Sequence, residues 1–260
     1  MATAGAMKKY TLKITLLFLL LGMGLSTPAR AAEPNWDSYA SLLKTHITSG
    51  EKHGVRLNLV DYPGLARDKR WPKLLAQLTR FDLHQLTTRD EKLVFWINTY
   101  NILAIKTVLD HWPLQSIRDA GSLFSPVWNK PVAVVAGKMR SLHEIEHEIL
   151  RPMGEPRIHF AIVCASVSCP DLRAEPYDVA SLNRQLDAQV SAFLARPHKG
   201  LLLQHGRIRL SKIFDWFEDD FQAHGGVLNF VLQYRPDIPE GTRLASYLDY
   251  DWSLNSTSGT

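Results

Sequence analysis

The sequence predicts an α+β fold, a single domain in which a buried central helix packs on a small, mainly antiparallel sheet with helices around it. Three observations predict this class. The 260 residues are 45% hydrophobic and 22% charged, as in an ordinary folded domain. One long segment, residues 88–109, is apolar on nearly all sides and therefore suits the centre of a core. Helical and strand-like segments are mixed without the regular alternation of a parallel α/β protein.

The chain before the central helix predicts two helices and one strand. Apolar side chains at helical spacing predict helices over residues 36–47 and 72–79. Residues 55–60 predict a short strand, which the Asp-Tyr-Pro-Gly sequence at 61–64 ends as a turn.

Sequence signals mark both ends of the central helix. Thr88 and Glu91 have the spacing of a capping box, and Pro113 prevents continuation of the helix. Asn98 and Asn101 share one face of this otherwise apolar helix. Buried amides need hydrogen-bond partners, so these two either tie neighbouring loops to the core, which we favour, or line a pocket.

The chain after the central helix mixes short helices with strands. The elements predicted there are a hairpin over 130–140, a helix over 141–150 opened by a second capping box of Ser141 and Glu144, a buried strand over 158–164, a helix over 179–194, a hairpin over 201–210, helices over 215–221 and 227–232, and an extended stretch over 247–252.

Residues 1–31 have the pattern of a secretory signal peptide. Four basic and no acidic residues accompany an apolar run over 14–21, and the small residues Ala29 and Ala31 predict cleavage after Ala31. We expect export, most simply to a bacterial periplasm. Removing these four from the 30 basic residues leaves 26 against 26 acidic ones, so the mature chain has no net charge. Nucleic acid and, after cleavage, membranes are therefore not expected as partners.

The two cysteines, Cys164 and Cys169, are the most informative feature. In an oxidising compartment they predict a disulfide that pins the short loop between them. Alternatively, one of them is a nucleophile or redox thiol activated by an imidazole. His159 lies five residues before Cys164, an odd offset that on a strand puts the two side chains on opposite faces. His159 could meet Cys169 only if the loop folds back.

The sequence His-Glu-Ile-Glu-His over residues 143–147 has the spacing of a zinc site. On a helix, His143 and His147 would share a face and Glu144 could act as a base. The third histidine of the extended zinc-protease pattern is absent, because Met153 occupies its position. We therefore favour a solvated helix face with ion pairs and expect no metal.

Other patterns are less specific. Aromatic and acidic residues cluster at 212–221 and 249–252, where they could bind cations or sugars or form solvated amphipathic segments. The chain has no glycine-rich phosphate loop, nucleophile elbow or dinucleotide fingerprint. NAD, ATP and α/β-hydrolase chemistry are thus unsupported, and we expect no cofactor.

Several of these segments together resemble the DUF547 family. They are residues 95–101, 141–151, 156–161 and the Cys-Ala-Ser…Cys-Pro run over 164–170, with 211–216 and 250–255 looking like its C-terminal signatures. The family is named for having no established function. The resemblance favours Glu146, His147 and Arg151 over His143. It also raises as site candidates His159, Cys164, Ser166 and Cys169.

The leader pattern, the polar C-terminal end and the resemblance together predict a division of the chain. The expected parts are a signal peptide (1–31), an N-terminal helical and extended segment packed on the core (32–84), a DUF547-like domain (85–255) and a disordered tail (256–260).

The leading functional prediction is a thiol- and histidine-dependent hydrolase or transferase in the periplasm, acting on a small molecule or peptide. One alternative is a non-enzymatic binding or scaffold protein whose Cys164–Cys169 loop is pinned by a disulfide. A second is a zinc hydrolase using His143 and His147. The candidate catalytic residues are Cys164, Cys169, His159, His147 and Glu146, and the candidate binding residues are Asn98, Asn101, Arg151 and Ser166.

Overall fold

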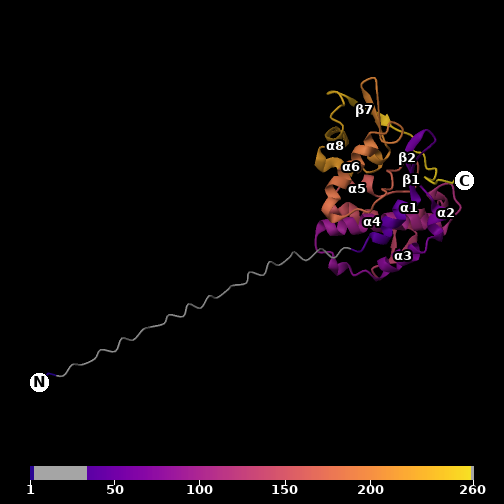
Figure 1. The fold of residues 1–260 in the computed structure, drawn as a ribbon. Coiled ribbons are helices and arrows are strands. Elements are labelled where there is room, and N and C mark those ends of the chain that lie inside the picture. The colour runs from indigo at the N-terminus through magenta and orange to yellow at the C-terminus, as the bar shows by residue number, and fades with distance from the viewer. Residues whose placement is uncertain (3–33, 259–260) are drawn as a thin grey trace. The chain divides into compact units, whose positions relative to one another are not determined.

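The α+β class is confirmed, and the long apolar helix lies at the centre of the fold (Figure 1). This computed structural model describes residues 1–2 and 34–258. The features that predict the signal peptide lie outside the described residues. No helix of the described part is long and apolar enough to cross a bilayer.

The central helix α4 (Arg89–Asp110) begins at the predicted capping box. Thr88 Oγ1 accepts a hydrogen bond from the Glu91 N–H at 3.2 Å, and Glu91 Oε2 accepts one from the Thr88 N–H at 2.8 Å. Two of the four N–H groups that a helix start leaves unpaired are thereby satisfied. Residues on every side of α4 are buried, because α3 lies on one side of it and α5 and α6 on the other (Figure 1).

In the part of the chain that the structure describes, three α-helices and a hairpin precede α4. They are α1 (Asp37–His46), β1 (Ile47–Lys52), β2 (Val55–Val60), α2 (Tyr62–Arg67) and α3 (Arg70–Arg80). The strand β1 was not predicted, and the expected turn at 61–64 is instead the first turn of α2. Asp61 Oδ1 accepts the Gly64 N–H at 2.9 Å and Pro63 follows, which together are a helix start signal. Side chains of these helices share one core with α4.

The strands within residues 34–258 form three small sheets. β1 and β2 pair antiparallel, as do β3 (Pro131–Val135) and β4 (Lys138–Ser141). In the third sheet β5 (Leu201–Gln204) pairs antiparallel with β6 (Arg207–Leu210), and β7 (Arg243–Tyr247) adds in parallel. Both predicted hairpins after α4 are confirmed.

The expected strand over 158–164 is wrong. Residues Ile158–Ala161 form one helical turn, α5, in which the Ile162 N–H donates to the Ile158 carbonyl at 2.9 Å. All four side chains of α5 are buried, so the segment has no polar face, and without one helical and strand periodicity cannot be told apart. The inference that His159 and Cys164 lie on opposite faces of a strand is therefore void.

The segment after β4 also differs from its prediction. The Glu144 N–H donates to Ser141 Oγ at 3.1 Å, but the Glu144 carboxylate pairs with Lys138 and Arg140, so the second capping box is only half formed. Residues Glu144–Leu150 form a π-helical segment, η4. Such segments are rare and are frequent at functional sites.

A second core lies between α6 (Leu182–Leu194), α7 (Ile213–Trp216), the 3₁₀ segment η7 (Glu218–His224) and α8 (Val227–Tyr234). Its centre is aromatic, with Phe160 of α5 packed against Phe214 and Phe230 at ring-centroid distances of 5.4 and 6.0 Å. Because Phe160 is next to His159, this core helps to fix the position of that histidine.

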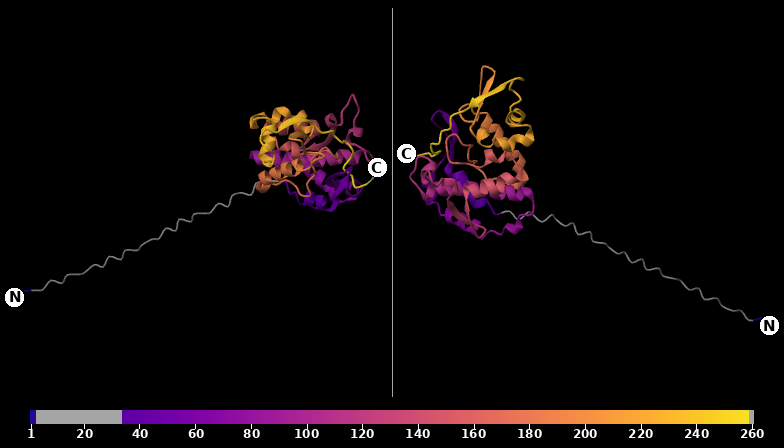
Figure 2. Two further views of the ribbon diagram at one scale, coloured as in Figure 1. Left: turned by 90° about the horizontal axis from the view of Figure 1, so that it is seen from above. Right: turned by 180° about the vertical axis from the view of Figure 1, so that it is seen from behind.

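The C-terminal segment returns to the N-terminal hairpin, as the views of Figures 1 and 2 agree. The Val60 N–H donates to the Asn255 carbonyl at 2.8 Å, and the Thr257 N–H to the Val60 carbonyl at 3.0 Å. Ser256 is buried and bridges Val60, although we expected a disordered tail from this residue onward.

Candidate functional site

A cavity of about 400 Å³ brings most of the predicted site residues together. This volume is in the range of small-molecule sites. Besides Tyr250, polar side chains that line it come from α4, η4, α5 and the loop after α5, and they are Tyr100, Glu146, His147, His159, Cys164 and Cys169.

The thiol of Cys164 lies among hydroxyl groups. Its Sγ is 3.2 Å from Ser166 Oγ and 3.2 Å from Tyr250 Oη. Burial opposes ionisation, but hydrogen bonds from Cys169, Ser166 and Tyr250 stabilise the thiolate more strongly and lower the pKa of Cys164 to about 7. About half of the thiol is therefore thiolate at neutral pH, whereas an ordinary cysteine is mostly protonated.

The second cysteine has the opposite character. Cys169 Sγ accepts a hydrogen bond from the Cys164 backbone N–H at 2.8 Å. Burial and the neighbouring Cys164 raise the pKa of Cys169 well above its usual value. Both cysteines are free thiols, so the disulfide that we considered as a structural pin is not formed. Hydrogen bonds to the C-terminal segment hold the loop instead.

These bonds cross the loop at several points. The Asn255 N–H donates to the Ala165 carbonyl at 3.0 Å, and the Val167 N–H donates to the Ser253 carbonyl at 2.9 Å. Ala165 has a φ of 57°, a left-handed conformation that is uncommon for a residue with a Cβ. Strain of this kind persists where the surroundings impose it and clusters at active sites. Here it directly follows the acidic thiol.

Asp220 contacts one histidine of the cavity, His159, directly, and it is linked to the other, His147, through Arg151. The Arg151 guanidinium donates two hydrogen bonds to the Asp220 carboxylate, at 2.7 and 2.8 Å, and one to His147 Nδ1 at 3.0 Å. His159 Nε2 is 2.7 Å from Asp220 Oδ2. Although burial opposes ionisation, the bonds from His159 and Arg151 hold the pKa of Asp220 well below its usual range.

The partners of the two imidazoles assign opposite tautomers. A guanidinium can only donate, so His147 Nδ1 accepts and the proton of the neutral ring is on Nε2. An ionised carboxylate can only accept, so His159 carries its proton on Nε2 and leaves Nδ1 with a free lone pair. That Nδ1 is buried and has no hydrogen-bond partner. His147 therefore offers a proton donor to the cavity residues, and His159 offers a base.

Both rings are neutral at pH 7. Burial, with the charges of His143 and Arg151, lowers the pKa of His147 to about 4. Burial also lowers the pKa of His159, against the opposing effect of Asp220. A neutral His159 can accept a proton, as a general base must.

Glu146 is a buried carboxyl on η4. It accepts a hydrogen bond from Tyr100 Oη at 3.0 Å. Burial raises the pKa of Glu146 to about 7; the Tyr100 bond opposes this rise and the nearby Cys164 adds to it. The carboxyl is thus protonated in mildly acidic solution, unlike an ordinary glutamate.

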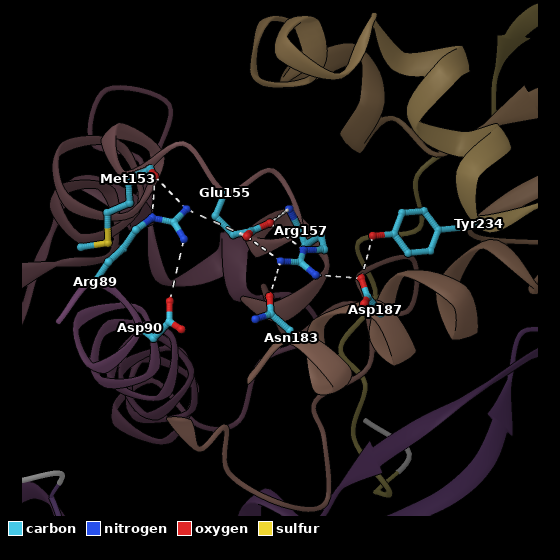
Figure 3. Close-up of polar contacts among 8 residues, drawn as sticks. All are labelled: Arg89, Asp90, Met153, Glu155, Arg157, Asn183, Asp187 and Tyr234. Atoms are coloured by element: carbon cyan, nitrogen blue, oxygen red, sulfur yellow. Dashed lines mark hydrogen bonds and ion pairs between the residues drawn. The ribbon is translucent and has the colours of Figure 1, made fainter. Parts of the chain in front are cut away.

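A polar network holds the segment that leads into α5 (Figure 3). Arg157 donates to Glu155 at 2.7 Å, to Asp187 at 2.8 Å and to Asn183 at 2.8 Å. The Tyr234 hydroxyl also donates to Asp187, at 2.8 Å. This network connects α6 and α8 to the residues immediately before His159.

The two amides of α4 have structural contacts outside the cavity lining. The Asn98 side chain bonds to the carbonyl and the N–H of Tyr177, each at 2.9 Å. The Asn101 side chain donates to the Ala161 carbonyl at 3.0 Å and accepts the Val163 N–H at 2.9 Å. Asn101 thereby fixes the chain just before Cys164.

The zinc alternative lacks its site. Within residues 34–258 no three His, Cys, Asp or Glu side chains are arranged to hold a metal ion. The rings of His143 and His147 lie against each other with centroids 4.5 Å apart, and Arg151 occupies Nδ1 of His147. Glu144, the expected base, is held by Lys138 and Arg140.

Sequence reasoning missed three contributors. Asp220 and the hydroxyl of Tyr250 act on residues more than sixty positions away in the chain, and only the aromatic and acidic clusters at 212–221 and 249–252 signalled them. The third is an aromatic wall of the cavity, formed by Trp128, Trp216, Tyr250 and Trp252.

Comparison with known proteins gives one match. No curated protein and no solved structure matches the chain. The family model described as "Protein of unknown function, DUF547" matches residues 83–194, a shorter range than the predicted 85–255. The matched range contains the cysteines and histidines of the cavity together with Tyr100 and Glu146, whereas Asp220 and most of the aromatic wall, Tyr250 included, lie beyond it. Residues 83–194 of this chain therefore match the DUF547 family model, as the sequence resemblance predicted.

Proposed function

We propose that the cavity is the active site of a cysteine-dependent hydrolase or transferase that moves an acyl group through a thioester on Cys164. One observation carries the proposal. A thiol with a pKa of about 7 and an imidazole with a free, buried Nδ1 line the same cavity. These are the nucleophile and the base of thiol catalysis, and Asp220 orients the base as a third group.

In the first half of the reaction, the Cys164 sulfur attacks the carbonyl carbon of an ester, thioester or amide. A C–S bond forms and the thiol proton passes to His159 Nδ1, directly or through one water molecule. The tetrahedral intermediate then breaks its bond to the leaving group, which takes the proton from His159. The products are a free alcohol, thiol or amine and an acyl-thioester on Cys164.

In the second half, water or another nucleophile attacks the thioester. His159 Nδ1 accepts the proton of the attacking group, the C–S bond breaks, and the proton returns from His159 to the Cys164 sulfur. His147, as a donor through Nε2, suits stabilisation of the oxyanion in both halves. Whenever Glu146 is protonated, it adds no second negative charge beside the thiolate.

The proposed place of action is the periplasm, after removal of residues 1–31. The support for this is the charged, apolar and small-residue pattern of the leader.

The proposal is tested by alkylation and acylation of the purified mature protein. Iodoacetamide should modify Cys164 first, with a rate that rises through an apparent pKa of about 7, as followed by intact mass and peptide mapping. Cys169→Ser should keep this fast phase, and Cys164→Ser should lose it. Two thiols that both titrate near ~8.5, the value of an ordinary cysteine, would overturn the proposal.

Acyl transfer is then measured with activated thioesters and esters. One acyl group per chain should appear on Cys164, and His159→Gln should slow its formation by roughly 10²- to 10⁴-fold, the usual contribution of a general base. His224→Gln is the matched control, because His224 is exposed. Equal rates in wild type and His159→Gln would exclude His159 as the base.

A further inference from the structure

One side of the cavity is a continuous aromatic surface that reaches the nucleophile. The ring of Tyr250 lies 4.6 Å from that of Trp252 and 4.8 Å from that of Trp216, between centroids. Trp216 and Trp252 are stacked at 5.7 Å with an interplanar angle of 24°, and Trp128 contacts Trp252 edge-on at 5.7 Å. The Tyr250 hydroxyl is the group 3.2 Å from Cys164 Sγ. A group bound against this wall is therefore next to the thiol.

The wall has unburied apolar area. Trp216 is 46% exposed, although a tryptophan of this size normally buries most of its surface. Large apolar side chains left open at the lining of a cavity are typical of ligand-binding sites. A flat apolar group that covers Trp216 gains the free energy of removing both surfaces from water.

The polar part of the cavity offers little to a charged group. Asp220 and Arg151 neutralise each other by two hydrogen bonds, and each also bonds to one of the cavity histidines. Both of those histidines are neutral at pH 7 because their pKa values are lowered. Among the described residues that line the cavity, none carries an unpaired positive charge. An anionic substrate group would lose its hydration there without gaining a partner.

We infer that the acyl group transferred by Cys164 is uncharged and carries an apolar, preferably flat, side group that packs on Trp216, Tyr250 and Trp252. This inference rests on the proposed function. It makes Trp216 a determinant of specificity, because this ring has the largest exposed area of the wall. Unlike Tyr250, Trp216 makes no hydrogen bond to the thiol, so a change at Trp216 alters the wall and not the partners of the thiol.

The test uses N-substituted chloroacetamides as probes. The Cys164 thiolate displaces chloride from the probe, so a C–S bond forms as the C–Cl bond breaks. Second-order rate constants are measured for ethyl, butyl, 2-phenylethyl, 2-carboxyethyl and 2-aminoethyl substituents and divided by those of the same probes with glutathione. The butyl probe should exceed the ethyl probe by about fourfold per methylene, and the phenylethyl probe should exceed the carboxyethyl probe by at least ~10-fold.

Variants separate the contribution of the aromatic wall from the general reactivity of the Cys164 thiol. Trp216→Ala should reduce the ratio of phenylethyl to carboxyethyl rates toward one, whereas Trp216→Phe should retain most of it. Met139→Ala is the matched control, because Met139 is an exposed apolar residue of β4 that does not line the cavity. Equal relative rate constants for all of the probes in the wild type would overturn the inference. An unchanged ratio of phenylethyl to carboxyethyl rates in Trp216→Ala would overturn it as well.

A binding measurement keeps the two proposals distinguishable. In Cys164→Ser, the non-reactive acetamide analogues of the probes should bind in the same order of affinity, as followed by tryptophan fluorescence. If these analogues bind in that order while wild-type Cys164 is unreactive even to iodoacetamide, the acyl-transfer function fails and the apolar site stands. If Cys164 is reactive but the affinities of the analogues do not follow the expected order, the inference fails and the acyl-transfer function stands.

Discussion

The acidity of Cys164 depends on hydrogen bonds from Cys169, Ser166 and Tyr250, because burial alone would raise its pKa. Tyr250→Phe removes one donor and should raise the pKa of Cys164 by about one unit, since a hydrogen bond to a charged group contributes about 1.5–3 kcal/mol. The alkylation rate at pH 7 should fall accordingly, and the pH–rate profile checks it. Tyr234→Phe, which alters a hydroxyl bonded to Asp187, should leave the profile unchanged. If Tyr250→Phe has the same pH–rate profile as the wild type, this hydroxyl does not stabilise the thiolate.

Glu146 makes a residue-scale prediction about stability and pH. Its pKa is raised from 4.5 to about 7, so between these values the folded protein holds a proton that the unfolded chain releases. Stability from this group is therefore highest at low pH and falls as pH rises from about 4.5 to 7. Glu146→Gln has no carboxyl group to ionise, so it does not lose stability in this way. Its free energy of unfolding relative to that of wild type should therefore rise by roughly 3 kcal/mol between pH 4.5 and pH 8. Urea unfolding at the two pH values measures this gain.

Glu144→Gln is the control with the opposite sign. Hydrogen bonds from Lys138 and Arg140 overcome partial burial and lower the pKa of Glu144, so its charge stabilises the fold above its usual pKa. The variant should lose up to ~1 kcal/mol at pH 8 and less at low pH. Glu146→Gln that behaves like Glu144→Gln would show that Glu146 is not destabilised by burial.

At the scale of elements, the position of α5 depends on the Arg157 network that precedes it. Arg157→Met keeps the length of the side chain but leaves the buried Glu155 without its main partner. Removing one member of a buried pair costs about 3 kcal/mol, whereas Lys106→Met, which breaks an exposed pair with Asp110, should cost ~0–1 kcal/mol. Arg157→Met should also slow acylation of Cys164, because α5, which carries His159, starts one residue after Arg157. Full acylation rates in a destabilised Arg157→Met would show that the network supports the fold but not the position of His159.

At the scale of the whole molecule, the C-terminal segment holds the Cys164–Cys169 loop to β2. A chain that ends at Ser253 keeps Tyr250 and Trp252 but loses buried Leu254 and the backbone bonds of Asn255. We expect a loss of about 3 kcal/mol or more in stability, together with a higher pKa of Cys164. Thermal unfolding and the alkylation profile measure both, and a chain ending at Thr257 is the control.

A milder variant covers the case in which the shortened chain does not fold. Tyr62→Phe leaves Asn255 Oδ1 without the hydroxyl that donates to it at 2.8 Å. It should cost about 1–3 kcal/mol and shift the Cys164 profile in the same direction as the truncation. A stable truncated chain with an unchanged thiol pKa would show that the segment does not shape the loop.

The sequence by itself determined what depends on near neighbours along the chain. The capping box of α4 needs only Thr88 and Glu91, and the hairpins after α4 need only adjacent strands, so local patterns sufficed. The α+β class and the match of residues 83–194 to the DUF547 family model followed as well. The cysteines and histidines of the cavity were named as site candidates because of their residue types.

Only the tertiary structure decided how these residues act on one another. Burial on all sides of residues 158–161 removes the periodicity that separates helix from strand, so α5 could not be told from a strand. Which cysteine is acidic depends on Cys169 and Ser166 and also on the distant Tyr250 hydroxyl, and which nitrogen of His159 is free depends on the distant Asp220. Both distant partners are brought close by packing of the whole fold. A pKa or a tautomer is set by the groups within a few ångströms, and a linear sequence does not state which groups these are.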